Sequence, residues 1–295
     1  MELKLGLILP PKIDDRTIPL SAILKVEKLP PLPVSYDVDE AVGGIQDNFV
    51  FNNSVYGDCV IAQQAHFILR LEKYEQGIQI PITDKEVTDE YFRQSGGGDN
   101  GLYMLNAMKE WRNHGILIGG KVYNIYAFAK AEPVDHTQIK YCIYLLGGLP
   151  FGMEVFQTDV DQFNAGEPWH LTGNNGAFRG GHGVYGFSYK TQHNDCPHCL
   201  TGWNEDGLTC MTWGKKQFIE WGFWDARVSE AYGIVDNRDS WLGNDSPVDI
   251  AKLDAYLKEI TGEEPSNCPF SNSICKVFNI GAGFLGRKTR LKAIV

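Results

Sequence analysis

The first half of the chain spaces its apolar residues three to four positions apart, which is typical of amphipathic helices. This pattern predicts a helix over residues 59–76. A second helix should begin after Thr83, because Thr83 and Glu86 have the spacing of a capping box. A third should follow the glycine-rich stretch SGGGDNG and end near Gly115. The predicted apolar side of the first helix comprises Ile61, Ala65, Ile68 and Leu69.

The second half has a different pattern. One more helix is expected in HTQIKYCIYLLGG, and short glycine-bounded runs rich in aromatic and β-branched residues then predict strands. These runs are LPFGMEVF, GGHGVYGFSYK, GLTCMTWG and EAYGIVD. Helices followed by an antiparallel sheet indicate an α+β fold. A late helix is predicted in SPVDIAKLDAYLKEITG, with Ser246 as its cap and Gly262 at its end.

These patterns divide the chain into three parts. Residues 1–35 are rich in proline and lack periodicity, so we expect an extended arm lying on the main domain. Residues 36–240 should form that domain, with a helical half at about 59–146 and a sheet half at about 147–236. Residues 241–295 should hold the late helix and a basic tail.

Composition excludes several classes of partner. The chain has 295 residues, a formal net charge of −10 and a pI near 5.2, which argues against nucleic acid because a phosphate backbone requires a basic face. No segment reaches the roughly 18 apolar residues of a membrane span. The start, MELKLGLILPPKIDD, has too short an apolar run for a signal peptide. We therefore expect a cytoplasmic protein with no membrane partner; its oligomeric state is not assigned.

Seven cysteines are present, and without a secretory signal structural disulfides are not expected. Cys196 and Cys199, in CPHC, have the spacing of a metal knuckle, and His193 and His198 stand close by. Three interpretations stay open for this segment: a zinc site, a disulfide or redox-active pair, and reduced thiols at a hairpin tip. No cofactor is favoured.

Two residues carry candidate chemistry. Cys59 stands at the predicted start of a helix, where the exposed N–H groups and the helix dipole stabilise a thiolate. His182, in RGGHGVYGFSYK, is flanked by glycines that leave its ring approachable. A cysteine nucleophile requires an imidazole partner, which the sheet half could present across a cleft. The alternatives are a small buried cysteine and a locally bonded histidine.

The order of these features resembles the papain-like (C1-type) cysteine proteases over roughly residues 30–236. The resemblance lies in YGDCVIAQQAH, GGGDNGLYMLNAMKEWRNHGI, GHGVYGFSY and MTWGKKQFIEWGFW. A closer resemblance is to uncharacterised bacterial and phage proteins that carry YGDC. The papain-like resemblance implies a cleft between the two halves, with Cys59 as nucleophile and His182 as base. It also implies Asn53 at the oxyanion-hole position and Trp213 as a shield over the histidine.

The chain departs from this pattern at several positions. Met211 occupies the place of the family's orienting asparagine, and methionine accepts no useful hydrogen bond. Asn53 is shorter than the family's glutamine. A charged Asp58 beside Cys59 would raise the pKa of the thiol. No long propeptide precedes the predicted domain.

Two functions follow from the sequence. The first is a cysteine peptidase or amidase with a Cys59–His182 dyad, possibly weakened. The second is a catalytically degenerate papain-like scaffold used for binding or assembly, for example as a structural component of a phage particle or a cell surface. In both cases the expected substrate or partner is a peptide or protein.

Overall fold

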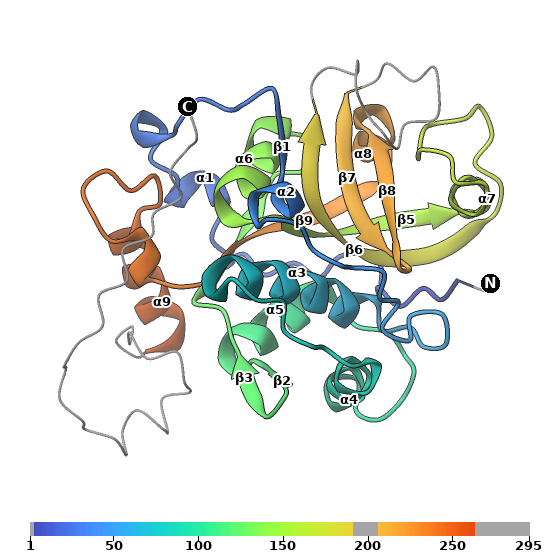
Figure 1. The fold of residues 1–295 in the computed structure, drawn as a ribbon, viewed down its shortest axis with the longest axis horizontal. Coiled ribbons are helices and arrows are strands. Elements are labelled where there is room, and N and C mark those ends of the chain that lie inside the picture. The colour runs from blue at the N-terminus through green and yellow to red at the C-terminus, as the bar shows by residue number, and fades with distance from the viewer. Residues whose placement is uncertain (1–2, 191–205, 263–295) are drawn as a thin grey trace.

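A helical layer packs against one large antiparallel sheet in the computed structural model, which describes residues 3–190 and 206–262 (Figure 1). The helical layer consists of α3 (Cys59–Gln76), α4 (Asp84–Ser95) and α5 (Met104–Asn113). Thr83 and Glu86 form the expected capping box at the start of α4. The three helices and the α+β class predicted from the sequence are therefore confirmed.

The sheet has seven strands. Six follow the order β4 (Ala127–Ala131), β9 (Val228–Val235), β5 (Leu149–Phe156), β6 (Phe178–Lys190), β7 (Gly207–Thr212) and β8 (Lys215–Glu220). The short strand β1 (Ser35–Asp37) pairs with the far end of β6. All neighbouring pairs are antiparallel. The four runs that predict strands correspond to β5, β6, β7 and β9.

Helix α6 (His136–Leu146) packs on the sheet and confirms the helix expected there. Apart from α6 and the late helix described below, the remaining elements were not predicted from the sequence. Short helices follow two of the strands: α7 (Gln157–Ala165) comes after β5, and α8 (Trp221–Arg227) after β8. A two-stranded hairpin follows α5. The remaining short elements are β2 (Ile116–Ile118), β3 (Lys121–Tyr123), α1 (Leu20–Ile23), α2 (Val38–Ala41), η1 (Val26–Lys28) and η2 (Asp239–Trp241).

The late helix begins later than its sequence pattern indicates. Helix α9 spans Ile250–Thr261, and Asp249, not Ser246, caps it by accepting a hydrogen bond from the Lys252 N–H. The Ser246 hydroxyl instead bonds to the backbone of Val248. The helix ends where expected, because Gly262 adopts a left-handed conformation at its C-terminus.

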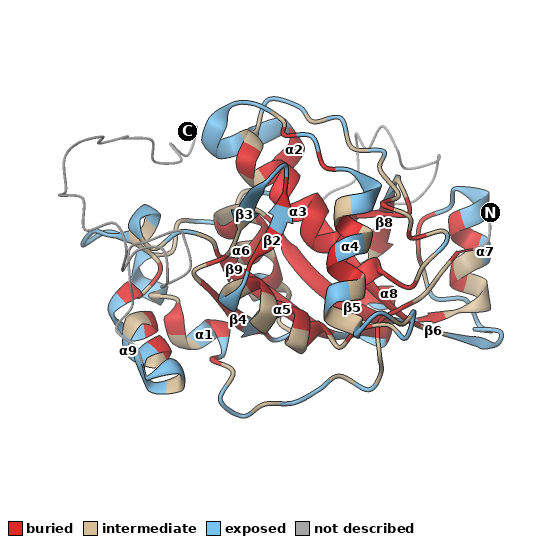
Figure 2. Ribbon diagram, turned by 90° about the horizontal axis from the view of Figure 1, so that it is seen from below, coloured by how far each residue is buried: buried red, intermediate tan, exposed pale blue. Residues whose placement is uncertain are grey.

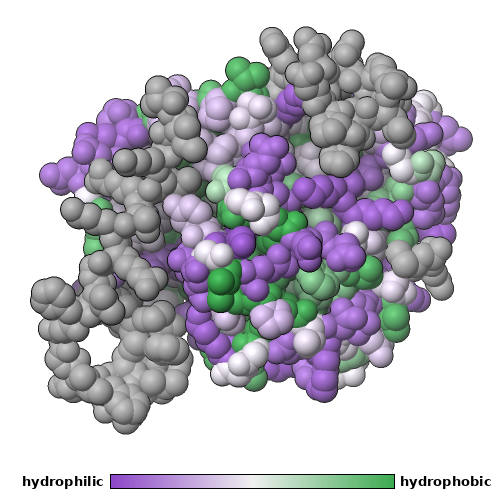
Figure 3. Space-filling view, in the orientation of Figure 1, coloured by the Kyte–Doolittle hydropathy of each residue, from purple (hydrophilic) through white to green (hydrophobic). Residues whose placement is uncertain are grey.

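Helix α3 is the centre of the core and is buried on nearly all sides (Figure 2). Its predicted apolar residues are buried, but so are polar ones on its other faces: Gln63, Gln64, His66, Arg70 and Glu72. The outer surface is mixed: on the face seen in Figure 3, hydrophilic residues surround a smaller group of apolar ones. Among the described helices, none is both long and apolar enough to cross a membrane.

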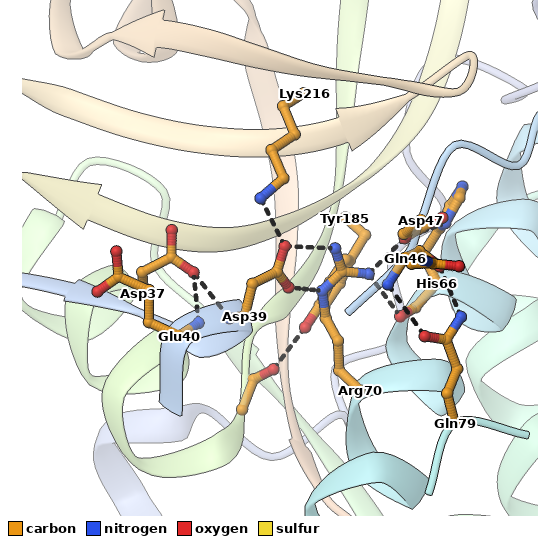
Figure 4. Close-up of polar contacts among 11 residues, drawn as sticks. Asp37, Asp39, Glu40, Gln46, Asp47, His66, Arg70, Gln79, Tyr185 and Lys216 are labelled. Atoms are coloured by element: carbon orange, nitrogen blue, oxygen red, sulfur yellow. Dashed lines mark hydrogen bonds and ion pairs between the residues drawn. The ribbon is translucent and has the colours of Figure 1, made fainter. Parts of the chain in front are cut away.

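Arg70 is the most deeply buried charge of this helix (Figure 4). Its guanidinium donates to Asp39 at 2.7 Å and to Asp47 at 2.6 Å. It also packs on the ring faces of Tyr185 and Phe187 of β6, with its central carbon 4.9 and 4.6 Å from their ring centroids. The interaction therefore joins the segment before α3, the helix itself and the sheet.

We expect Arg70→Met to destabilise the fold strongly, because it leaves the carboxylates of Asp39 and Asp47 buried with one cation fewer. The expected loss is about 3–5 kcal/mol in the free energy of unfolding, measured by urea denaturation. Arg93→Met is the matched control: Arg93 is 45% exposed in its pair with Glu90, so its loss should stay below about 1 kcal/mol. Equal losses in the two variants would contradict this role of Arg70.

Candidate active site

Cys59 is the first residue of α3, and its side chain lies where the helix meets the sheet. The backbone N–H of Gly183 in β6 donates to Cys59 Sγ at 3.3 Å. Because Gly183 directly follows His182, this contact brings the two predicted catalytic residues to one place, although they are 123 positions apart in the chain. Both residues are buried.

His182 is held on two sides. Its Nε2 lies 2.6 Å from the hydroxyl oxygen of Thr212. The indole of Trp213 lies flat on the imidazole, with ring centroids 3.9 Å apart and an angle of 11° between the planes. Its Nδ1 has no hydrogen-bond partner within residues 3–190 and 206–262. The ring is therefore oriented from its Nε2 side and covered by Trp213, while Nδ1 remains available.

The orienting contact belongs to Thr212 and not to Met211, the residue that the resemblance aligned with the family's asparagine. Met211 pairs with Tyr185 in the β6–β7 ladder. At Trp213, with a φ of +44°, the chain turns out of β7, and the Thr212 hydroxyl reaches the imidazole. The correction matters because a hydroxyl accepts and donates hydrogen bonds, whereas a thioether does neither well.

Asn53, the residue aligned with the oxyanion-hole position, lies in the segment just before α3. Its side-chain N–H donates to the carbonyl of Tyr56 at 3.2 Å, and its side chain lines a small cavity together with Cys59 and His182. The amide is thus near the thiol but is engaged locally. Its role towards an oxyanion stays a prediction.

The N-terminal arm passes directly over Cys59, which the sequence did not predict. The Leu7 N–H donates to the Gly181 carbonyl at 3.1 Å on the sheet side. On the helical side, the Leu102 N–H donates to the Gly6 carbonyl at 2.8 Å and the Ile8 N–H to the Leu102 carbonyl at 3.0 Å. The arm is therefore bound to both walls through its main chain, as an added strand would be. In Figure 1 it runs from the N-terminus between the helices and the sheet.

This close passage requires glycine on both sides. A Cβ on Gly6 would lie 1.7 Å from the carbonyl oxygen of Gly57, two residues before the thiol. No long propeptide was expected ahead of the domain, but the first residues of the chain, 4–8, occupy the space beside Cys59.

Burial controls the charge state of the pair. Loss of solvent raises the pKa of the Cys59 thiol to about 11, although the backbone N–H groups of Gly183, Gly6 and Leu7 act in the opposite direction. Burial also lowers the pKa of the His182 imidazole to about 3. At neutral pH both groups are uncharged with the arm in place, so the site holds a thiol and a neutral imidazole.

Asp58 does not carry the charge that its position beside Cys59 suggests. It is fully buried, it does not cap α3 with its side chain, and burial raises its pKa to about 8. Its carboxyl is therefore mostly protonated at neutral pH. The expected electrostatic penalty on the thiolate appears only above that value.

Two further histidines are bound to other side chains. His66 of α3 lies 2.8 Å from Asp47, which also binds Arg70. His170 lies within hydrogen-bond distance of Gln162 of α7. The possible metal ligands Cys196, Cys199, His193 and His198 lie outside the described residues. Within the described ranges, no cluster of three or more potential metal ligands occurs.

Two contacts of the site were not predicted from the sequence: that of Thr212 with His182, and that of the arm with the cleft walls. Thr212 is a polar residue next to the family's tryptophan position, so its place was a usable signal. The arm carries no such signal, because LKLGLIL has the composition of any short apolar strand.

Asp58→Asn should change how stability depends on pH. The pKa of Asp58 is about 8 in the folded protein, against a value near 3.9 in the unfolded chain. Between these two pH values the folded protein holds a proton on Asp58 that the unfolded chain has lost. The contribution of Asp58 to wild-type stability therefore falls as pH rises from about 4 to about 8. The variant should gain on the wild type by up to about 1.4 kcal/mol per pH unit in this window. Urea denaturation across this pH range measures it. Asp15→Asn is the exposed control, and its stability should depend on pH as that of the wild type does. If the stability of Asp58→Asn also follows the wild type across this pH range, Asp58 does not hold a buried proton.

No family model and no curated protein matches the sequence. Among solved structures, xylellain, a cysteine protease from Xylella fastidiosa, aligns with a TM-score of 0.60 at 14% identity, over 80% of this chain and 98% of its own. Procathepsin L2 from Tenebrio molitor aligns with a TM-score of 0.56 at 16% identity, over 79% and 78%. Procathepsin B S9 from Trypanosoma congolense aligns with a TM-score of 0.55 at 13% identity, over 79% and 86%. The fold of this chain is that of the papain-like cysteine proteases.

Proposed function

We propose that this chain is a cysteine peptidase held in a latent state by its own N-terminal arm. One observation carries the proposal: an extended peptide, residues 4–8, lies across the Cys59 thiol and is bound through its main chain to both walls of the cleft. Such walls recognise peptides irrespective of side chain, so a peptide substrate can take the place of the arm. This favours a peptidase over an amidase for small molecules.

The proposed reaction uses Cys59 as nucleophile and His182 as general base. His182 Nδ1 takes the thiol proton, and the thiolate attacks the carbonyl carbon of the scissile peptide bond. The imidazolium then returns the proton to the leaving amine, and water hydrolyses the acyl-enzyme. Thr212 orients the ring, and Trp213 shields it from solvent.

The arm is bound in a way that avoids its own cleavage. It brings the backbone N–H groups of Gly6 and Leu7 close enough to the sulfur to favour the thiolate, while the Leu7 N–H donates its hydrogen bond to the Gly181 carbonyl. A nucleophilic attack requires a carbonyl carbon at that position instead. The arm also keeps Cys59 and His182 dry and therefore neutral. When it leaves, water returns, and both pKa values should move towards their ordinary range.

A degenerate scaffold is the second candidate, and a specific observation favours it. With the arm in place the thiol is neutral and buried beside a buried carboxyl, which is a resting state without a nucleophile. The two functions differ in what happens to Cys59 once the arm is displaced. A peptidase should then expose a reactive thiolate, whereas a scaffold should not.

Gly6→Ala should displace the arm, because the added methyl group collides with the Gly57 carbonyl. Overpacking of this kind costs about 1–3 kcal/mol, which corresponds to a roughly 5- to 150-fold faster alkylation of Cys59. Iodoacetamide labelling at pH 6–7, with mass spectrometry of the Cys59 peptide, measures the rate.

The control is Gly222→Ala, where the added methyl meets no atom within 4 Å. Its labelling rate should equal that of the wild type. Slow labelling of Cys59 in both the Gly6→Ala variant and a chain lacking residues 1–10 would refute latency by the arm and favour the scaffold.

Cys59→Ala should abolish peptide hydrolysis in the Gly6→Ala background without unfolding the protein. The thiol is the proposed nucleophile, whereas a buried alanine is tolerated at a helix start. Cleavage of a fluorogenic peptide library measures activity, and the urea midpoint measures folding. The comparison variant is Cys142→Ala, which removes a buried cysteine from α6, away from the cleft, and should keep activity. Hydrolysis that persists without Cys59 would rule out the thiol mechanism.

A further inference from the structure

A small cavity lies beside the Cys59–His182 pair, between α3 and the sheet. Its volume is about 10 Å³, close to the space needed by the centre of one water molecule. The helix contributes Cys59 and Gln63 to its lining, and the sheet contributes His182 and Thr212. The cavity therefore touches both partners of the orienting hydrogen bond.

Two polar groups in the lining of this cavity lack a partner among the described residues: the amide of Gln63 and Nδ1 of His182, the atom proposed to take the Cys59 proton. Gln63 is 1% exposed, and neither its amide oxygen nor its amide nitrogen has a hydrogen-bond partner in the described part of the chain. The two other polar side chains of the lining that could compete are engaged, because His66 is bound to Asp47 and Asn53 to the Tyr56 carbonyl. An unsatisfied buried amide costs about 1–3 kcal/mol, so a bridging water at this site is strongly favoured.

The hydrogen bond between Thr212 and His182 can be formed in two ways. In the first, Nε2–H donates to the Thr212 oxygen, and Nδ1 keeps a lone pair that can accept the Cys59 proton. In the second, the Thr212 hydroxyl donates to Nε2, and Nδ1 already carries a proton. Catalysis requires the first arrangement. The hydroxyl proton of Thr212 then needs an acceptor of its own.

We infer that a water molecule in this cavity joins Thr212 to Gln63, and that Gln63 is thereby a positioning residue that holds His182 as its Nε2–H tautomer. The water accepts the hydroxyl proton of Thr212 in a hydrogen bond and donates to the amide oxygen of Gln63. Thr212 is then left as an acceptor towards His182. The inference rests on the proposed function, because it assigns the state of the proposed base.

The test is the tautomer of His182, read by long-range ¹H–¹⁵N spectra of ¹⁵N-histidine-labelled protein at pH 7, with His182→Asn used for assignment. Wild-type protein should show the Nε2–H form. Gln63→Met keeps the size and flexibility of the side chain but removes the acceptor, so at least half of His182 should change to the Nδ1–H form. Gln63→Glu keeps an acceptor oxygen and should retain Nε2–H.

Gln64→Met is the matched control. Gln64 is the next residue of α3, is also fully buried, and has no partner for its amide among the described residues, but it does not line the cavity. Its substitution should leave the tautomer unchanged, which separates positioning from general disturbance of the helix. In a Thr212→Val background the effect of Gln63→Met should disappear, because the coupling runs through the hydroxyl.

The inference is overturned if wild-type His182 is mainly Nδ1–H, or if Gln63→Met leaves the Nε2–H form intact. If Gln63→Met does not fold, the wild-type and Gln63→Glu spectra decide, since an Nδ1–H form in either contradicts the inference. These readouts require no catalysis. Failure of Cys59 to react after the arm is displaced would instead refute the proposed function and leave the tautomer result standing.

Discussion

The buried guanidinium of Arg70 is the constraint on which the geometry of this molecule depends. A charge without access to water must be matched by opposite charge and by donor–acceptor contacts, which here come from Asp39 and Asp47. Its faces pack on Tyr185 and Phe187 of β6. Cys59 lies eleven residues earlier on the same helix, about 16 Å along its axis, and His182 lies three residues before Tyr185 on the same strand. The contacts of Arg70 therefore fix α3 against β6, and these two elements hold Cys59 and His182 in place relative to each other.

The burial that packs the core also leaves the ionisable side chains of the candidate site uncharged at neutral pH. Cys59 and His182 are buried, and a buried thiol and imidazole remain neutral at pH 7. The Asp58 carboxyl behaves in the same way and keeps its proton. Reactivity and solvent access are thus coupled at this site: removing the arm would change the charge state of the pair as well as its accessibility.

The sequence predicted the helical layer and four strands because their periodicity is local, and it predicted Cys59 and His182 as partners because the order of motifs resembles a known fold. It found only Met211 at the orienting position and did not find the Thr212 contact, since the left-handed turn at Trp213 cannot be read from spacing. The late helix was started too early because Ser246 and Asp249 are both acceptable caps. The arm itself was expected, but its place beside Cys59 was not, because its binding uses main-chain groups, which leave no signature in side-chain identity.

The glycines of the cleft give the strongest argument that its shape serves an extended main chain. Side chains added at Gly6 or Gly101 would strike backbone across the arm–wall contact, and one at Gly181 would lie 2.4 Å from the Leu7 carbonyl. These glycines come from three separate segments, and no local turn explains the ones at Gly6 and Gly181, whose φ values lie outside the left-handed range. Peptide backbone can lie this close to the start of α3 only where neither the arm nor the walls carry a side chain at the contact. This steric requirement connects the arm, the walls and Cys59.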